Sequence, residues 1–135
     1  MPKTSDNARL QQAIEGAILD RESLADAYGY EGPEANEAVA DVKRLGSLRR
    51  KRLSSMSPDA LSLAFKALVW AEQWESGLAD ANPPGSEDRR TAALAAASYR
   101  ELRLRRWGKT QFEAIMERAV SVPIDEIPAL RRSRK

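Results

Sequence analysis

The feature that most constrains this fold is a motif that occurs twice in the chain. Residues 24–53 align without a gap on residues 78–107, at an offset of 54, and eight of the 30 aligned positions are identical. Roughly two identities would arise by chance in a chain this rich in Ala and Arg. Each copy contains the end of one helix, a loop with Gly or Pro, and a second helix that ends in basic residues. The identical pairs are Leu24/Leu78, Ala25/Ala79, Asp26/Asp80, Ala27/Ala81, Ala38/Ala92, Leu48/Leu102, Arg49/Arg103 and Arg52/Arg106.

Apolar residues at three- and four-residue steps predict five helices, and no segment shows the alternation of a strand. Ser57 before Pro58 is typical of a helix start, and Thr110 with Glu113 fits a capping box. Gly29 is expected in the left-handed conformation that ends a helix. The predicted helices cover residues 5–28, 33–52, 58–81, 86–107 and 111–120.

Short loops between long helices favour antiparallel neighbours. The predicted fold is therefore all-α, with two antiparallel helical hairpins, related by the internal repeat, that form a bundle. A short fifth helix and an extended basic C-terminal tail follow. We expect one helical domain over residues 1–120 and a partly disordered tail over residues 121–135.

Composition excludes several classes of protein. The chain has neither Cys nor His, which rules out thiol nucleophiles, Ser-His-Asp triads and Cys/His zinc sites. Neither form of Gly-rich phosphate loop occurs. We therefore expect no enzymatic activity, no cofactor and no bound metal. No apolar run has the length of a membrane span and the N-terminus is polar, so a cytoplasmic location without a membrane partner is expected.

Charge is distributed unevenly along the chain. Residues 1–41 carry nine acids and three bases, whereas residues 42–135 carry eleven acids and nineteen bases. The basic clusters fall at the same position of each repeat, and one hypothesis is that they meet at one end of the bundle and bind nucleic acid. The alternative is that cations simply gather at helix C-termini for electrostatic reasons. The candidate residues are Arg49, Arg50, Lys51, Arg52, Arg103, Arg105, Arg106 and Lys109.

Tryptophan and the C-terminal tail suggest a different function, which is binding of another protein. Trp70 and Trp74 stand one helical turn apart, and aromatic side chains are frequent anchors of protein interfaces. Their more ordinary role would be to fill the core. The tail combines apolar residues with proline and can dock on its own domain or in a groove of a partner. The candidate protein-binding residues are Trp70, Trp74, Trp107, Val122, Pro123, Ile124 and Ile127.

Carboxylates provide a third hypothesis. Glu34 and Glu37 with Asp41 lie in the second predicted helix, and Glu72 with Glu75 lies in the third. Antiparallel packing would bring them to one level of the bundle, where a cluster of carboxylates can hold Mg²⁺ and activate water. Over these two short segments the chain resembles the all-α MazG-like nucleotide pyrophosphohydrolases, which use paired E-x-x-E and E-x-x-D motifs. The resemblance implies Mg²⁺-dependent nucleotide hydrolysis. The alternative is that these carboxylates are ordinary solvent-exposed residues on the helix surface.

The function we expect first is that of a non-catalytic helical binding protein. It would act through protein–protein contacts as an adaptor, an assembly subunit or an accessory protein of a phage or mobile element. Nucleic-acid binding is the alternative, and Mg²⁺-dependent hydrolysis is the third hypothesis. Homo-oligomerisation through the Ala-rich segment of residues 92–97 remains open.

Overall fold

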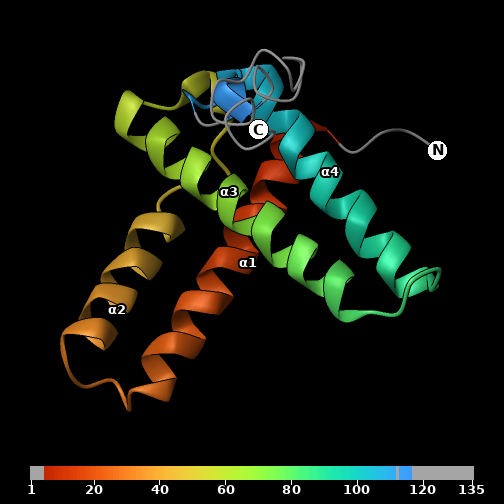
Figure 1. Ribbon diagram of the computed structural model, residues 1–135. Helices are drawn as coiled ribbons and strands as arrows, with labels where there is room; N and C mark the ends of the chain where they lie inside the picture. The colour runs from red at the N-terminus through yellow and green to blue at the C-terminus, as the bar shows by residue number, and fades with distance from the viewer. Residues whose placement is uncertain (1–4, 112, 117–135) are drawn as a thin grey trace, which may run out of the picture. The chain divides into compact units, whose positions relative to one another are not determined.

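A computed structural model describes residues 5–111 and 113–116 (Figure 1). Within these residues all regular secondary structure is helical, and no strand is formed. The predicted all-α class is confirmed. The chain divides into two compact units, residues 1–103 and 104–135, with the boundary inside the last long helix. None of the described helices is both long and apolar enough to cross a membrane.

The first hairpin consists of α1 (Asp6–Ala27) and α2 (Pro33–Gly46). Ser5 starts α1 as its N-cap, because its hydroxyl oxygen accepts a hydrogen bond from the Ala8 N–H at 3.1 Å. Gly29 follows the helix with a φ of +64°, as predicted from the sequence. Five residues connect the two helices, which run antiparallel (Figure 1).

The second hairpin consists of α3 (Pro58–Ala81) and α4 (Glu87–Trp107). A short 3₁₀ turn, η1 (Leu53–Ser55), precedes α3. Ser57 and Ser86 cap the two long helices, and each hydroxyl oxygen accepts the N–H three residues further on, at 3.2 Å. These starts agree with the sequence, because a serine before the first turn satisfies a backbone donor that the helix itself leaves unpaired.

The internal repeat is visible in the structure. α1 ends at Ala27 and α3 at Ala81, and α2 begins at Pro33 and α4 at Glu87, so both boundaries recur at the offset of 54. Three of the identical pairs are buried in both copies, which means that the repeat also fixes part of the core. These pairs are Ala25/Ala79, Ala38/Ala92 and Leu48/Leu102.

α2 is shorter than predicted. The helix ends at Gly46, and the basic run of residues 49–52 lies in turns and extended chain beyond it. Arg50 has a φ of +64°, which is outside the right-handed helical region. The prediction that the second helix continues through residues 49–52 was therefore wrong.

Two polar side chains of α1 fix the path of this loop. The Gln11 amide donates to the carbonyls of Leu48 and Lys51, at 3.0 and 3.3 Å, and accepts from the Arg50 N–H at 3.2 Å. Asn7 accepts from the N–H of Leu53 at 2.9 Å. Because α1 supplies partners for these backbone groups, the chain can leave the helix without losing hydrogen bonds.

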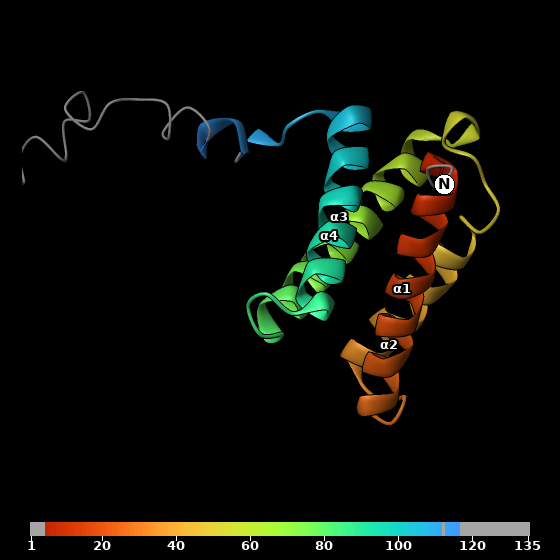
Figure 2. The same ribbon diagram turned by 90° about the vertical axis from the view of Figure 1, so that its right-hand side faces the viewer.

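α1 is the central helix of the first unit. It packs along α2 and is crossed by α3, and α4 lies alongside α3 (Figures 1 and 2). The Arg9 guanidinium lies over the Tyr99 ring of α4, 5.6 Å from its centroid, so α1 also touches the fourth helix. Three of the six largest fully buried side chains belong to α1, namely Leu10, Ile14 and Ile18.

Some apolar residues of the helical stripes are exposed. Tyr28 follows the end of α1 at the hairpin tip, and Val39 lies on the outer side of α2. Leu78 lies near the C-terminal end of α3, and 40% of it is exposed. Apolar periodicity identifies a stripe on each helix, but the lengths of the neighbouring helices decide how much of that stripe is covered.

The second unit contains the last turn of α4 and the capping box. Gly108 ends the helix with a φ of +76°. Thr110 accepts from the Glu113 N–H at 3.1 Å, and Glu113 accepts from the Thr110 N–H at 3.0 Å, as the sequence predicted. Residues 111 and 113–116 are helical. The rest of the predicted fifth helix and the predicted tail lie outside the described residues, and the single domain over residues 1–120 remains a prediction.

Candidate functional site

The most distinctive surface is the tryptophan face of α3, formed by Trp70, Trp74 and Leu78 at four-residue intervals. The two indole rings stack with 5.9 Å between their centroids and 16° between their planes. Trp70 is half-buried against α1. Its ring lies so close to Gly16 that a Cβ added at this glycine would be only 2.8 Å from the Trp70 Cζ3. Trp74 is 51% exposed.

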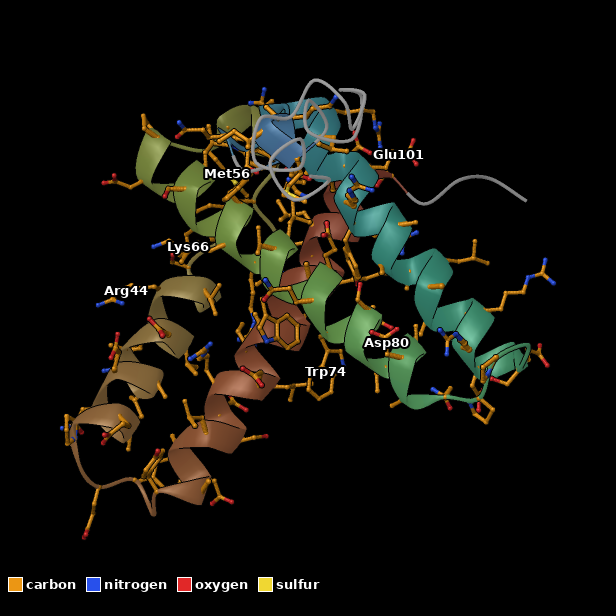
Figure 3. The ribbon with its side chains drawn as sticks, viewed as in Figure 1. Arg44, Met56, Lys66, Trp74, Asp80 and Glu101 are labelled. Carbon is orange, nitrogen blue, oxygen red and sulfur yellow. The ribbon has the colours of Figure 1, made fainter. Side chains whose placement is uncertain are left out.

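The arrangement of α1 and α3 explains why only part of this face is covered. The two helices cross near Gly16 and Trp70 and then diverge toward their C-terminal ends (Figure 1). Trp74 projects from α3 on the side of α1 (Figure 3). α1 therefore covers Trp70, whereas Trp74 and Leu78 extend past the crossing and remain open to solvent.

The other predicted protein-binding residues belong to other parts of the chain. Trp107 is partly buried on the last turn of α4, in the second unit. The four tail residues lie outside the described residues, and they are Val122, Pro123, Ile124 and Ile127. Of the seven candidates, the structure brings Trp70 and Trp74 together.

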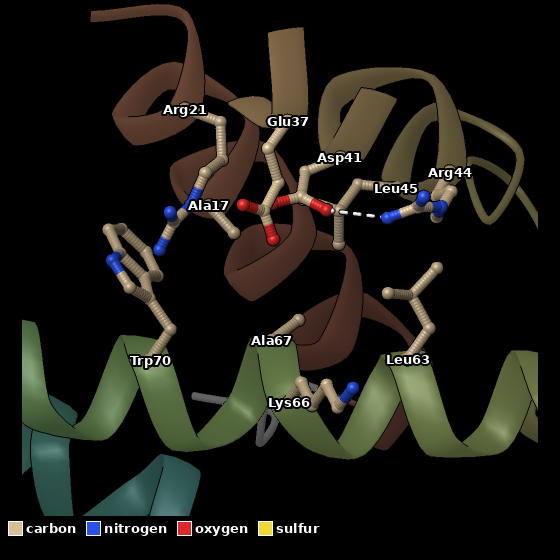
Figure 4. Close-up of a pocket in the computed structure, with 10 residues that line it drawn as sticks. All are labelled: Ala17, Arg21, Glu37, Asp41, Arg44, Leu45, Leu63, Lys66, Ala67 and Trp70. Carbon is tan, nitrogen blue, oxygen red and sulfur yellow. Dashed lines mark hydrogen bonds and ion pairs between the residues drawn. The ribbon is translucent and has the colours of Figure 1, made fainter. Parts of the chain in front are cut away.

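A pocket of about 340 Å³ lies beside Trp70, between α1, α2 and α3 (Figure 4). Its apolar wall combines the indole with small or aliphatic residues of all three helices. The carboxylates of Glu37 and Asp41 reach into it from α2, and Asp41 pairs with Arg44 at 2.8 Å. The remaining charged residues that line it are Arg21 of α1 and Lys66 of α3.

The first basic cluster is a loop with a fixed backbone. Arg49, Arg50, Lys51 and Arg52 are all exposed, and the hydrogen bonds from α1 described above hold their main chain. Arg49 pairs with Glu15 of α1, with 2.7 Å between Nε and Oε1. This hydrogen bond, followed by the charge of Glu15, holds the pKa of the Arg49 guanidinium above its usual value.

The second basic cluster is divided by burial. Arg103 is only 4% exposed, and its guanidinium pairs with Glu72 of α3 at 3.1 Å. Such a position joins α4 to α3 and is at odds with the phosphate contact predicted for Arg103. Arg105, Arg106 and Lys109 are exposed in the second unit.

The carboxylates of the third hypothesis do not form a metal site. Glu34, Glu37, Glu72 and Glu75 are all described, and no group of three or more acidic residues in the described chain could hold a metal ion. Glu72 instead pairs with Arg103. The convergence expected from antiparallel packing is therefore absent, and with it the geometry that the hydrolase hypothesis required.

No protein-family model, curated protein or solved structure matches this chain. The site is consequently defined by its own geometry. Sequence reasoning missed the contribution of Gly16, which admits the Trp70 indole, and that of Gln11, which holds the basic loop. For Gly16 the available signal is a glycine inside a predicted helix, because glycine weakens a helix and its presence there indicates a close packing contact.

Proposed function

We propose that this chain is a non-catalytic helical binding protein that engages another protein through the tryptophan face of α3. The exposure of Trp74 is the observation that carries the proposal. It fits an adaptor, an assembly subunit or an accessory protein of a phage or mobile element, in which the partner covers Trp74 and Leu78.

The physical argument is that this face is both apolar and held in position. Trp70 is fixed against the α1 backbone, and Trp74 stacks on Trp70, so its side chain has little freedom to lose when a partner binds. Tryptophans of this kind are the commonest anchors of protein interfaces. An indole with half of its surface in water is otherwise unfavourable, since each Å² of apolar surface that stays exposed forgoes about 25 cal/mol.

The test is co-purification from the native host with the wild type, Trp74→Ala and Leu94→Ala. Leu94 is a matched control because it is 62% exposed and lies on α4. We expect a partner that the wild type and Leu94→Ala retain and Trp74→Ala loses. With that partner purified, Trp74→Ala should weaken binding by about 2 kcal/mol or more, roughly 30-fold. A partner held equally by Trp74→Ala would place the interface elsewhere.

A second candidate function is nucleic-acid binding through the basic loop. It is supported by the fixed backbone and exposed side chains of Arg50, Lys51 and Arg52. Because phosphate contacts release counterions, the affinity for an oligonucleotide should fall steeply with salt concentration. Arg50→Gln/Arg52→Gln should weaken that affinity and flatten its salt dependence. The control Lys43→Gln/Arg90→Gln removes two exposed charges elsewhere and should have a smaller effect.

A further inference from the structure

A second pocket of about 340 Å³ adjoins the one beside Trp70, and cations from three separate elements line it. They are Arg44 of α2, Lys51 of the basic loop and Lys66 of α3 (Figure 3 labels Arg44 and Lys66). Ser62 of α3 also lines the pocket. The packing of α2, α3 and the loop brings these three cations to one pocket, and their order in the sequence does not predict it.

The charges of this pocket are not balanced within the described structure. Arg44 uses one guanidinium nitrogen for Asp41 at 2.8 Å. Lys51 and Lys66 form no ion pair with any described residue, and Asp59 is the one carboxylate among the lining residues. Three cations around one small volume repel one another, and a bound anion removes that cost.

The two pockets share Arg44, Leu63 and Lys66, which stand between them. On the far side of this shared wall lies the indole of Trp70. From Ser62 to Trp70 the axis of α3 rises by about 12 Å, at 1.5 Å per residue. An anion held by the three cations therefore lies about two helical turns along α3 from the indole.

We propose that the paired pockets bind an organic phosphate monoester, with the phosphate among Arg44, Lys51 and Lys66 and the carbon part toward Trp70. A phosphate dianion faces three cations in this pocket against the single carboxylate of Asp59, and its three terminal oxygens accept hydrogen bonds from ammonium, guanidinium and hydroxyl donors. The site shares Trp70 with the tryptophan face but includes neither Trp74 nor Leu78, and the proposal does not depend on the protein-binding function.

NMR titration of the isotopically labelled protein tests the proposal with phenyl phosphate, inorganic phosphate and phenol. Phenyl phosphate should bind with a Kd of about 1 mM, tighter than either fragment, and shift the amide signals of Ser62 and Lys66 and the Trp70 indole signal. Binding should strengthen as the pH rises through about 6, where the monoester becomes a dianion. No shift of these signals up to about 20 mM would overturn the proposal.

Variants separate this pocket from general attraction by the basic loop. Lys51→Gln/Lys66→Gln should weaken phenyl phosphate binding by about tenfold or more, because two charge-assisted contacts are lost. Arg50→Gln/Arg52→Gln removes the same charge outside the pocket and should change it by less than about twofold. Ser62→Glu places a carboxylate at the pocket and should abolish binding. Equal weakening by the two double variants would refute the site.

A peptide containing phosphotyrosine identifies the source of the phosphate. Binding of the peptide with at least the affinity of phenyl phosphate, and with the same sensitivity to Lys51→Gln/Lys66→Gln, assigns the site to a phosphorylated polypeptide. Exclusion of the peptide, with phenyl phosphate still bound, assigns it to a small phosphate ester. Both results support the phosphate site, and neither depends on Trp74.

Discussion

At the scale of single residues, two arginines at equivalent repeat positions have the same kind of partner in different surroundings. Arg49 pairs with Glu15 and Arg103 with Glu72, and in both cases the glutamate belongs to the first helix of the same hairpin. The first pair is about half-exposed, whereas the Arg103 side chain is 5% exposed. Solvent screens the first pair, and burial makes the second one expensive to break.

Arg103→Met should therefore destabilise the protein by about 3 kcal/mol, because it leaves Glu72 largely enclosed without its partner. Arg49→Met removes the repeat-equivalent pair at an exposed site and should change stability little. Urea unfolding followed by circular dichroism measures both. In the double variant Glu72→Met/Arg103→Met much of the loss should return, and equal effects of the two single variants would contradict this account of burial.

Gln11 makes a second prediction at the residue scale. Its amide forms three hydrogen bonds with the backbone of the basic loop. Gln11→Ala should lower the free energy of unfolding by about 1–3 kcal/mol, because loop carbonyls and an N–H lose their partner. Hydrogen exchange of the Arg50 amide should accelerate in parallel.

The neighbouring variant Gln12→Ala is the control. Gln12 is exposed, and its side chain accepts a single hydrogen bond from Arg9 at 3.3 Å. Its effect should stay within about 0.5 kcal/mol. If Gln11→Ala were equally mild, other contacts would have to determine the path of the loop.

At the scale of the elements, the crossing of α1 and α3 determines what the tryptophan face looks like. The helices approach closely at Gly16, where the absence of a side chain admits the edge of Trp70. Beyond this point no described helix covers that side of α3, and Trp74 is half-exposed. The same apolar stripe thus supplies core at one end and a binding surface at the other.

Replacing glycines by alanine tests this crossing. Gly77→Ala in α3 meets nothing within 4 Å and should stabilise the protein by about 1 kcal/mol through helix propensity. Gly16→Ala gains the same propensity but pushes on Trp70 at 2.8 Å, so the net stabilisation should be lost. Near-ultraviolet circular dichroism should report a disturbed tryptophan stack in Gly16→Ala alone. Equal stabilisation by both variants would show that Trp70 moves aside freely.

At the scale of the whole molecule, the two hairpins of the first unit are joined through α1. Its buried side chains face α2 and α3, and Arg9 reaches the Tyr99 ring of α4. Burial raises the pKa of the Tyr99 phenol, the charge of Arg9 opposes that change, and Glu75 adds to it. The phenol is therefore held neutral at the junction of the hairpins.

The raised pKa of Tyr99 predicts how the free energy of unfolding changes at alkaline pH. Because the folded protein keeps the proton of Tyr99 more tightly than the unfolded chain, the linked stability is complete below the unfolded pKa of about 10 and is lost as the pH rises through the higher folded value. Wild type should lose more unfolding free energy than Tyr99→Phe between about pH 9 and pH 11. Urea unfolding at both pH values gives the comparison, and parallel losses would mean that Tyr99 ionises without consequence.

The sequence by itself determined where the helices begin and where the hairpins turn. Serine caps, Pro58 and the glycines after α1 and α4 act through backbone hydrogen bonds and φ angles within a few residues. Their effect can therefore be predicted from the local sequence. Because the motif repeats at an offset of 54, the turn between the helices recurs at the corresponding position of the second hairpin. The tryptophans were recognised as a pair for the same reason, since four-residue spacing places two side chains on one helix face.

Tertiary structure decided which of those side chains meet solvent. The path of the chain after α2 depends on Gln11 and Asn7, which lie about 40 residues away in the sequence. The residues around the end of α2 therefore do not predict where this helix stops. The burial of Arg103 and the exposure of Trp74 depend on how far α1 and α4 extend beside α3. The exposure of a side chain depends on which helices pack beside it. Apolar periodicity therefore predicts the apolar face of a helix but not which part of that face is covered.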